Sequence, residues 1–470
     1  MNMKLIYIYL TVLSLVMLIS CGAGKNYQRP SLNMPDSYRK QLVIQEKTDT
    51  LAYQPQEFFT NKLLLALIDT AFVKNNDLLT AIKNIELAQS VLRTVKLNYL
   101  PDLTAQINGT YSHASKNSAA GQAGSRVSEN YNLSLGLNWD IDIWGRIRRE
   151  KQEALASYLQ TEEVRKTVQM RLVADVARAY YNLLMLDKQL GIANRSKELS
   201  DSTLQIMQLQ YKVGDANSLG IQQITAQVEQ NKLLISQIEQ SIASQENALS
   251  LLCGNYAQSI ERRFEPDAEF KESSADGLPV AILTKRPDVK AAEYALMAAN
   301  ARVGIRQAAM YPSLNINASG GLNSLATSNW FNIPASLFGT VAGGLTQPIF
   351  NKRRLKEQYE QAKIEREKEV INFRQAVLQA YSQTSDALKN REEIEKQYLF
   401  AKNREQALFG GIRSTNLLFQ TGNVTYLEVI TVQMNYLQAQ LDPVSLYVNE
   451  INANISLFHS LGGGWKQQNK

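Results

Sequence analysis

Few residues of this chain are of the types that carry out catalysis or bind metal ions. The sequence has only two histidines, His113 and His459, which lie far apart, and two cysteines, Cys21 and Cys253. It contains no H-E-x-x-H or C-x-x-C motif, and the G-A-G-K stretch at 22–25 lacks the spacing and the following Ser or Thr of a phosphate-binding loop. We therefore expect no enzymatic activity, no metal site and no bound cofactor.

Cys21 is the one residue whose surroundings predict a specific chemical modification. It follows Lys4 and an apolar run over residues 5–19, which is typical of a secretory signal and short for a membrane-spanning helix. The run ends in L-I-S-C, which resembles a bacterial lipobox, where the chain is cleaved before the cysteine and the cysteine receives diacylglycerol and N-palmitate. We expect a signal peptide over residues 1–20 and a lipid-anchored, extended segment over residues 21–60.

Acylation of Cys21 leaves a single thiol in the chain, so no intramolecular disulfide is expected. Cys253 lies in the apolar run A-L-S-L-L-C-G, which favours burial as a small hydrophobic residue over reactivity. The formal net charge of +6 is spread along helical stretches, a pattern typical of a solvated surface. Nothing in this distribution indicates binding to nucleic acid.

The elements around these residues begin with a strict alternation of side chains. In Y-N-L-S-L-G-L-N-W-D-I-D-I at 131–143, every odd position is apolar and every even position is polar or glycine. This pattern predicts a two-faced strand over about 130–143, and similar stretches predict strands over 102–113, 313–324 and, with more glycine, 337–350. One alternative is a soluble sheet with one wet face.

The length of these strands and the aromatic residues near their ends favour a membrane location. The polar side chains then line an aqueous lumen, which is the position expected of Asn138, Asp140 and Asp142. Four strands are too few to close a membrane barrel, and open sheet edges are not tolerated in lipid. Several chains must therefore share one barrel, and the strands alone allow two, three or four copies.

A very long helix follows the second strand. No proline occurs between Gly145 and Tyr211, so a continuous helix over 145–212 spans about 100 Å. Two heptad seams run along it, one starting with Leu172, Val176, Ala179 and Leu183 and the other with Val173, Ala177, Tyr180 and Leu184. Two seams indicate two neighbouring helices, which suits the wall of a helical tube.

The second half of the chain repeats the first. An offset of 211 residues aligns Pro101 with Pro312, and an offset of 208 aligns Gly214 with Gly422. We expect one repeat over 61–262, a linker over 263–286 and a second repeat over 287–470. Each repeat has a helix, two strands, a long helix and a return helix; the long helices are expected at 145–212 and 352–420, and the return helices at 217–253 and 425–461.

These features together predict an α+β membrane protein with a long α-helical coiled-coil barrel continuous with a shared β-barrel. The lipobox, the stretches W-D-I-D-I-W-G-R and T-Q-P-I-F-N-K-R-R-L, and the turns Y-K-V-G and T-G-N-V-T-Y-L-E-V resemble the TolC/OprM-type outer-membrane efflux proteins, in their lipoprotein branch. The resemblance covers nearly the whole chain. It implies a homotrimer with a twelve-stranded barrel in the outer membrane and a helical tunnel that crosses the periplasm.

The resemblance also implies partners and cargo. The partners are a periplasmic adaptor and an inner-membrane pump of the RND type or an ABC transporter, and the cargo is drugs or other small toxic solutes. One alternative keeps the fold but serves type I protein secretion with an ATP-driven transporter. Another is a lipid-tethered periplasmic coiled-coil scaffold, which explains the helices but leaves the strands without a role.

By resemblance, the hairpin turns carry the functional residues. Glu428 falls on an acidic position that narrows the tunnel entrance, and the periplasmic gate is expected to comprise Tyr211, Asp215, Phe419 and Glu428. The adaptor-docking tips are expected at Gly214, Gly422 and Asn423. The chain departs from the family pattern at Thr431, where a second acid is usual, at Val424, where some members have a latching arginine, at Phe419, where tyrosine is usual, and at Gly220, the first-repeat counterpart of Glu428.

Overall fold

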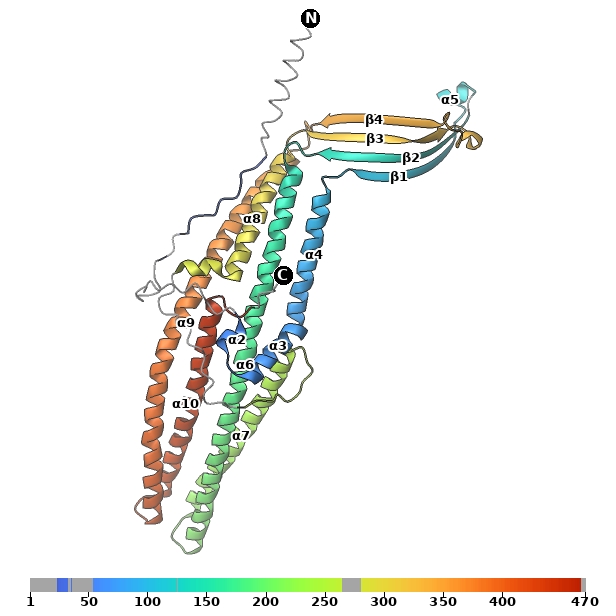
Figure 1. Cartoon of the computed structure of the whole chain (residues 1–470). Coiled ribbons are helices and arrows are strands. Elements are labelled where there is room, and N and C mark those ends of the chain that lie inside the picture. The colour runs from blue at the N-terminus through green and yellow to red at the C-terminus, as the bar shows by residue number, and fades with distance from the viewer. Residues whose placement is uncertain (1–22, 33–34, 36–53, 125, 264–279, 466–470) are drawn as a thin grey trace. The chain divides into compact units, whose positions relative to one another are not determined.

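The helices and strands follow one another in two similar series (Figure 1). The structure is a computed structural model and describes residues 23–32, 35, 54–124, 126–263 and 280–465. The first series is α2 (Pro55–Phe58), α3 (Lys62–Lys74), α4 (Asn76–Leu97), β1 (Asp102–His113), α5 (Ala119–Gln122), β2 (Val127–Ile141), α6 (Arg146–Lys212) and α7 (Ser218–Leu252). The second is η1 (Val280–Lys285), α8 (Pro287–Ala308), β3 (Ser313–Ser324), η2 (Thr327–Asn329), β4 (Leu337–Thr346), α9 (Arg354–Gln420) and α10 (Tyr426–Ser460).

Matching element lengths confirm the internal tandem repeat. The long helices α6 and α9 have 67 residues each, and the return helices α7 and α10 have 35 residues each. The expected signal peptide, Cys21 and most of the expected linker lie outside the described residues.

The chain divides into two compact units. One unit contains Ile85–Gln160 and Ala292–Phe373, together with the described residues up to Ser31. It holds the sheet and the adjoining parts of α4, α6, α8 and α9. The other unit contains Thr161–Ala291 and Arg374–Lys470 together with residues 32–84, and it holds the remainder of the helices.

The four strands form one antiparallel sheet in the order β1-β2-β3-β4. Residues directly opposite one another on neighbouring antiparallel strands point to the same face. Two rows across the sheet therefore show its sidedness: one joins Leu103, Leu137, Ala318 and Val341, and the next joins Thr104, Gly136, Ser319 and Thr340. The alternation predicted from sequence is thus in register across all four strands. The exceptions include Phe338 and Ala342 on the polar face and Glu129 on the apolar face.

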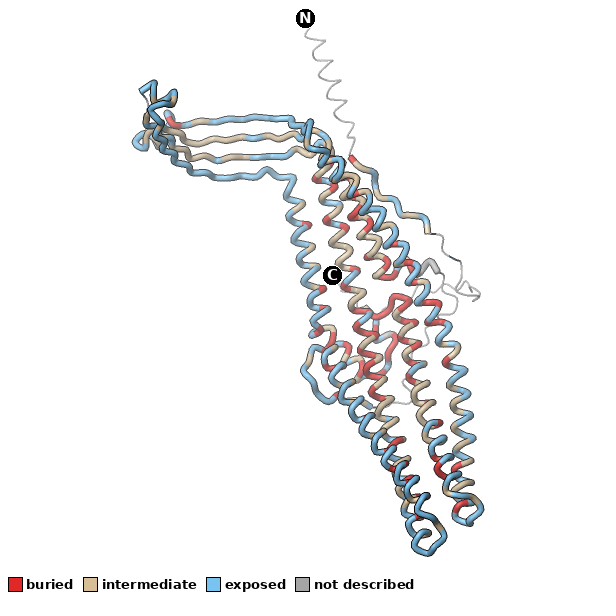
Figure 2. Tube along the Cα trace, turned by 180° about the vertical axis from the view of Figure 1, so that it is seen from behind, coloured by how far each residue is buried: buried red, intermediate tan, exposed pale blue. Residues whose placement is uncertain are grey.

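The apolar face of the sheet is open in the single chain. Leu103 is 70% exposed, Ile107 71% and Val341 80%. Figure 2 shows that buried residues lie mainly on the helices, whereas the strands are mostly exposed or intermediate. A sheet of this size with uncovered apolar side chains requires an apolar environment or a partner on that face.

Three boundaries differ from those expected. β2 begins at Val127, because its first residues pair with the end of β1, and it ends at Ile141. β4 ends at Thr346 instead of near residue 350, because β3 offers no partner before Ser313 and Pro348 lacks the N–H needed to continue a ladder. The segment expected to be extended over residues 21–60 includes the short helix α2, which begins at Pro55, a residue well suited to a first helical position.

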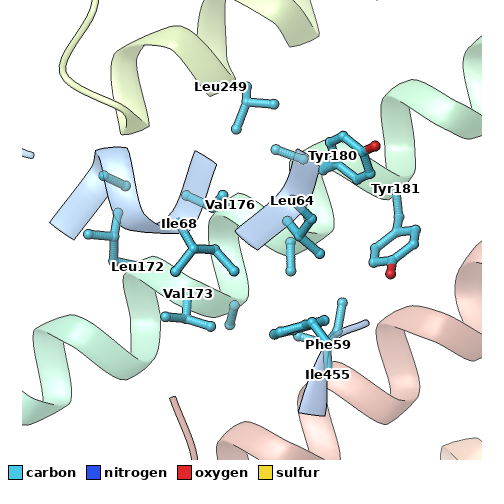
Figure 3. Close-up of a cluster of buried hydrophobic side chains, with 14 of the residues drawn as sticks. Phe59, Leu64, Ile68, Leu172, Val173, Val176, Tyr180, Tyr181, Leu249 and Ile455 are labelled. Carbon is cyan, nitrogen blue, oxygen red and sulfur yellow. The ribbon is translucent and has the colours of Figure 1, made fainter. Parts of the chain in front are cut away.

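The helical core lies where α3 packs against α6, α7 and α10 (Figure 3). Leu64 and Ile68 of α3 are almost fully buried, as are Val176 and Tyr180 of α6. Both predicted seams of α6 are buried in this region, which confirms that the helix has neighbours on two sides: Leu172, Val176, Ala179 and Leu183 on one seam, and Val173, Ala177, Tyr180 and Leu184 on the other.

Of two side chains of potentially reactive type, Cys253 is buried and His459 is partly buried. Cys253 is 1% exposed, and burial raises the pKa of its thiol to about 11, which confirms its role as a small hydrophobic residue. Burial, together with Arg286 and Arg178 nearby, lowers the pKa of His459 to about 4. His459, in the last turn of α10, is therefore neutral near pH 7.

None of the helices in the described part of the chain combines the length and the apolar character needed to cross a membrane.

Candidate functional site at the helical hairpin tips

The turns of the two helical hairpins have the same pattern of backbone hydrogen bonds. At the end of α6, Asp215 N–H donates to the Gln210 carbonyl and Gly214 N–H to that of Tyr211. At the end of α9, Asn423 N–H donates to Leu418 and Gly422 N–H to Phe419 in the same pattern. This is a Schellman motif, in which a residue with positive φ ends the helix. Gly214 has φ +84° and Gly422 has φ +73°, so glycine is favoured at both tips.

The return helices begin with different caps. The Asn217 side chain accepts a hydrogen bond from Gly220 N–H at 2.9 Å and caps α7. In the second hairpin, Thr425 N–H and its hydroxyl both donate to Oε2 of Glu428, at 2.6 and 3.1 Å. Glu428 is exposed and closes a capping box at the start of α10. One carboxylate oxygen of Glu428, an expected gate residue, therefore caps the N-terminus of α10.

Apolar residues from all four hairpin helices meet just behind the turns. This tip cluster consists of Met207 from α6, Ile224 from α7, Phe419 from α9, and Val429 and Ile430 from α10. Phe419 is only 9% exposed, so the structure places this expected gate residue inside the cluster. Its first-repeat counterpart, Tyr211, is 49% exposed, and Asp215 is exposed in the turn.

Gly220 lies at a point where the two hairpins approach each other closely. A Cβ atom at Gly220 would lie 2.5 Å from Met207 Cε and 3.1 Å from Tyr426 Cε1. Met207 is 1% exposed and has little room to move. The absence of an acidic residue here, noted from the sequence, therefore has a steric reason: a side chain at this position would have to displace Met207 and Tyr426.

A buried polar layer, which the sequence analysis missed, lies beside the tip cluster. Gln433 of α10 donates to Thr203 Oγ1 of α6 at 2.9 Å, and Asn231 of α7 donates to Ser200 Oγ of α6 at 3.0 Å. Gln227 donates to Asn231 Oδ1 at 3.3 Å. All five side chains are buried. Continuing the first heptad seam of α6 beyond Ala193 reaches Ser200, so a polar residue on a seam was the available signal.

The expected lumen residues lie on the sheet, in the unit that does not contain the tips. Asn138 is opposite Asn317, and Asp140 is opposite Asn315. Asp140 also forms an ion pair of 3.3 Å with Arg146. Asp142 follows β2, and its carboxylate accepts a hydrogen bond from Arg148 N–H at 3.0 Å, which fixes the start of α6. Two of the three residues thus contact the first turn of the long helix.

The family model described as "Outer membrane efflux protein" matches residues 67–255 and 278–463, which are the two repeats. The chain belongs to this family. It is therefore the outer-membrane channel component of an efflux system, extends into the periplasm and is not an enzyme. This assignment favours the channel over the tethered coiled-coil scaffold that the sequence left open.

Individual relatives match along most of their length. The cation efflux system protein CusC of Escherichia coli O6:H1 is 28% identical over 96% of this chain and 97% of its own length. The toluene efflux pump outer membrane protein TtgC of Pseudomonas putida is 28% identical over 88% of this chain and 85% of its own length. A crystal structure of CusC superposes with a TM-score of 0.85 at 27% identity, covering 94% of this chain and all of that one.

Replacing Gly220 by alanine tests the contact between the hairpins. We expect a loss of roughly 1–3 kcal/mol in the free energy of unfolding, because the added methyl group overpacks Met207 and Tyr426. Gly191→Ala is the matched control: Gly191 lies inside α6, and no atom lies within 4 Å of the position that a methyl group would take, so this change should stabilise the helix by up to about 1 kcal/mol. Equal thermal midpoints for the two variants would show that the hairpins do not pack at Gly220.

Proposed function

We propose that three copies of this chain share one twelve-stranded barrel in the outer membrane. β1 pairs only with β2, and β4 only with β3, so the sheet has two free edges within the described chain. In a homotrimer, β4 of each copy pairs with β1 of the next, which closes the barrel and removes both edges. The exposed apolar face then contacts lipid, and the face with Thr104, Asn138 and Asp140 lines the lumen.

Aromatic residues at the helical edge of the sheet support this location. Trp139 Nε1 donates to the Tyr99 carbonyl at 2.9 Å, and Trp144 Nε1 donates to the Pro312 carbonyl at 2.7 Å. Trp144 also packs on Tyr311, with ring centroids 4.9 Å apart. Tryptophan and tyrosine favour the interface between lipid and water, so this edge fits the membrane boundary on the helical side.

We infer that the channel conducts small toxic solutes, including metal cations and organic drugs or solvents. The observation that carries this proposal is the polar face of the sheet, which is rich in asparagine, serine and threonine, in a chain of the efflux family. Asparagine, serine and threonine side chains along this face offer weak hydrogen bonds to many solutes and no deep binding site. The relatives named for cations and for toluene are equally similar to this chain, which supports a lumen that does not select its cargo.

The hairpin tips are proposed to dock a periplasmic adaptor, which links the channel to an inner-membrane pump. Gly214, Gly422 and Asn423 shape the turns, and large apolar side chains are exposed around them. Val213 is 73% exposed and Leu219 53% in the first tip; Leu417 is 59% exposed and Leu427 56% in the second. Exposed apolar side chains rimmed by polar residues are typical of protein interaction surfaces.

The periplasmic gate is proposed to comprise Tyr211, Asp215, Phe419 and Glu428, with the tip cluster and the polar layer holding the closed arrangement. Gln433 and Thr203 join α10 of the second hairpin to α6 of the first. Opening must separate this pair and loosen the packing of Phe419. In a trimer, three copies of Glu428 form an acidic ring that attracts cations.

Cys21 is proposed to carry the lipid anchor. The described chain begins two residues later at Ala23, whose N–H donates to the Trp144 carbonyl at 2.9 Å. Arg149 donates to the Ala23 and Gly24 carbonyls at 3.0 and 2.7 Å. These contacts hold the chain beside the start of α6, at the edge of the sheet assigned to the membrane boundary, which is where an acylated residue is needed.

Crosslinking in intact cells tests the proposed function. The chain carries a tag after Lys470, and mass spectrometry identifies the partners. We expect an adaptor together with a proton-driven pump, and we expect Gly422→Val to reduce adaptor recovery while trimers persist, because valine is strained at φ +73°. Recovery of an ATP-driven transporter would instead assign the chain to type I protein secretion, and recovery of no periplasmic partner would contradict the proposal.

Glu428→Gln tests the gate. Glutamine at this position retains a capping box and removes the charge, so the hairpin should fold normally. We expect a reduced preference for cations in the reversal potential of single channels. Glu229→Gln, an exposed change on α7, is the matched control. A reversal potential that is the same in Glu428→Gln and the wild type would remove Glu428 from the gate.

Metabolic labelling with palmitate tests the anchor. We expect label in the wild type and in Cys253→Ser, whose thiol is buried, and no label in Cys21→Ala. Label that persists in Cys21→Ala would place the acyl chain elsewhere.

A further inference from the structure

The two places where a strand leads into a long helix differ in charge. Figure 1 shows β2 leading to α6 and β4 leading to α9 at the same edge of the sheet. We call residues 140–150 the first junction and residues 348–358 the second junction; the repeat offset of 208 aligns them. The first junction balances three arginines with three acids, namely Arg146, Arg148 and Arg149 with Asp140, Asp142 and Glu150. The second has four cations and one acid, namely Lys352, Arg353, Arg354 and Lys356 with Glu357.

Two of the three cations of the first junction, Arg146 and Arg149, have side-chain partners within the chain. Arg146 forms ion pairs with Asp140 and Glu150, at 3.3 and 2.8 Å. Arg149 is buried and donates to backbone carbonyls near residue 23. Most of the positive charge of this junction is therefore engaged in contacts within the chain.

The cations of the second junction are exposed and largely uncompensated. Arg353 lies 3.6 Å from Glu357, with the two side chains 72% and 56% exposed, a contact of little energetic value. Among the described residues, Lys352, Arg354 and Lys356 form no ion pair. The offset places Pro348 and Phe350 where the first junction has Asp140 and Asp142, so the carboxylates that balance the first junction are missing here.

The backbone of the second junction would suit glycine better than the residues it has. Arg353 immediately precedes α9 with φ +63°, and Lys352 has φ +54°. The equivalent of Arg353 before α6 is Gly145, with φ +77°. Positive φ disfavours side chains other than glycine, so the folded backbone alone does not account for the two cations.

Two exposed apolar residues precede this basic group in the chain. Ile349 is 93% exposed and Phe350 85%, and they follow Val341 and Leu345 on the apolar face of β4, which are 80% and 67% exposed. The second junction thus presents apolar side chains next to cationic ones at the sheet edge assigned to the membrane boundary. This arrangement complements a phospholipid, whose acyl chains and phosphate lie in the same order.

We propose that Lys352, Arg353, Arg354 and Lys356 bind the headgroups of anionic phospholipids in the leaflet on the helical side of the outer membrane. The proposal rests on the membrane location of the sheet given under the proposed function. Long basic side chains reach from an apolar surface to the headgroup level, and each one near an anionic surface strengthens binding. One such site on each copy would fix the depth of the sheet in the bilayer.

Native mass spectrometry of the detergent-purified, full-length protein tests the site. The probes are phosphatidylglycerol and phosphatidylcholine with the same acyl chains. We expect the wild type to retain phosphatidylglycerol preferentially, and Lys352→Gly/Arg353→Gly to lower that preference at least about fivefold, because each cation contributes about that factor. Glycine suits the positive φ of both positions, so the variant loses charge without backbone strain. Added salt should weaken the preference.

Lys389→Gln/Lys396→Gln is the matched control, because it removes two exposed charges from α9 in the other unit. It should leave lipid retention unchanged. The proposal is overturned by equal lipid retention in the glycine variant and the wild type, or by loss of phosphatidylglycerol when inorganic phosphate replaces chloride at constant ionic strength. It is also overturned by weakened trimers with unchanged lipid retention, which would make the junction a contact between copies. Single-channel conductance of the same samples tests the channel independently of the lipid site.

Discussion

The two free edges of the four-stranded sheet are the constraint on which the rest of this architecture depends. β1 and β4 each have one side without a ladder partner in the described chain. In lipid, every unpaired backbone group costs several kcal/mol, so a single copy is not a finished membrane structure. The apolar face, which includes Leu103, Ile107 and Val341, is equally incomplete. In the proposed trimer, neighbouring copies pair these edges around an aqueous lumen, and the helices that follow the strands form a tube.

The duplication produced two similar repeats, and the packing of their side chains differs at corresponding positions. Gly220 and Glu428 occupy equivalent places, yet one is pressed against Met207 and Tyr426 while the other is exposed and caps a helix. Gly145 and Arg353 both precede a long helix with positive φ, and only the second is charged. In each pair, the place in the repeat is shared and the side chain differs. The repeats thus share a scaffold, and the contact of Gly220 with Tyr426 is one place where packing between them makes their side chains differ.

Much of this scaffold could be predicted from the sequence, because it depends on local patterns. Strict alternation located the strands, glycine located the hairpin turns, and two seams on α6 indicated its two neighbours. The burial of Phe419, by contrast, depends on four helices meeting behind the tips, and no single-helix periodicity contains that information. The polar layer was missed for a related reason: Ser200 lies on a seam, but its partner Asn231 becomes apparent only when α7 is placed beside α6.

The hydrogen bonds between helices indicate which parts of the tip region can move separately. The side-chain hydrogen bonds that join α6 to α10 include those of Arg178 with Ser456, Gln189 with Ser445, and Thr203 with Gln433. Only the last lies near the tips. Ser200 and Asn231, on the other hand, join α6 to α7 within the first hairpin. Separating the hairpins at their tips therefore breaks one buried pair, at a net cost of about 1 kcal/mol, plus the packing of the tip cluster. Separating α6 from α7 would also leave the buried side chains of Ser200 and Asn231 without their hydrogen bond. Each hairpin is therefore expected to move as a rigid pair of helices.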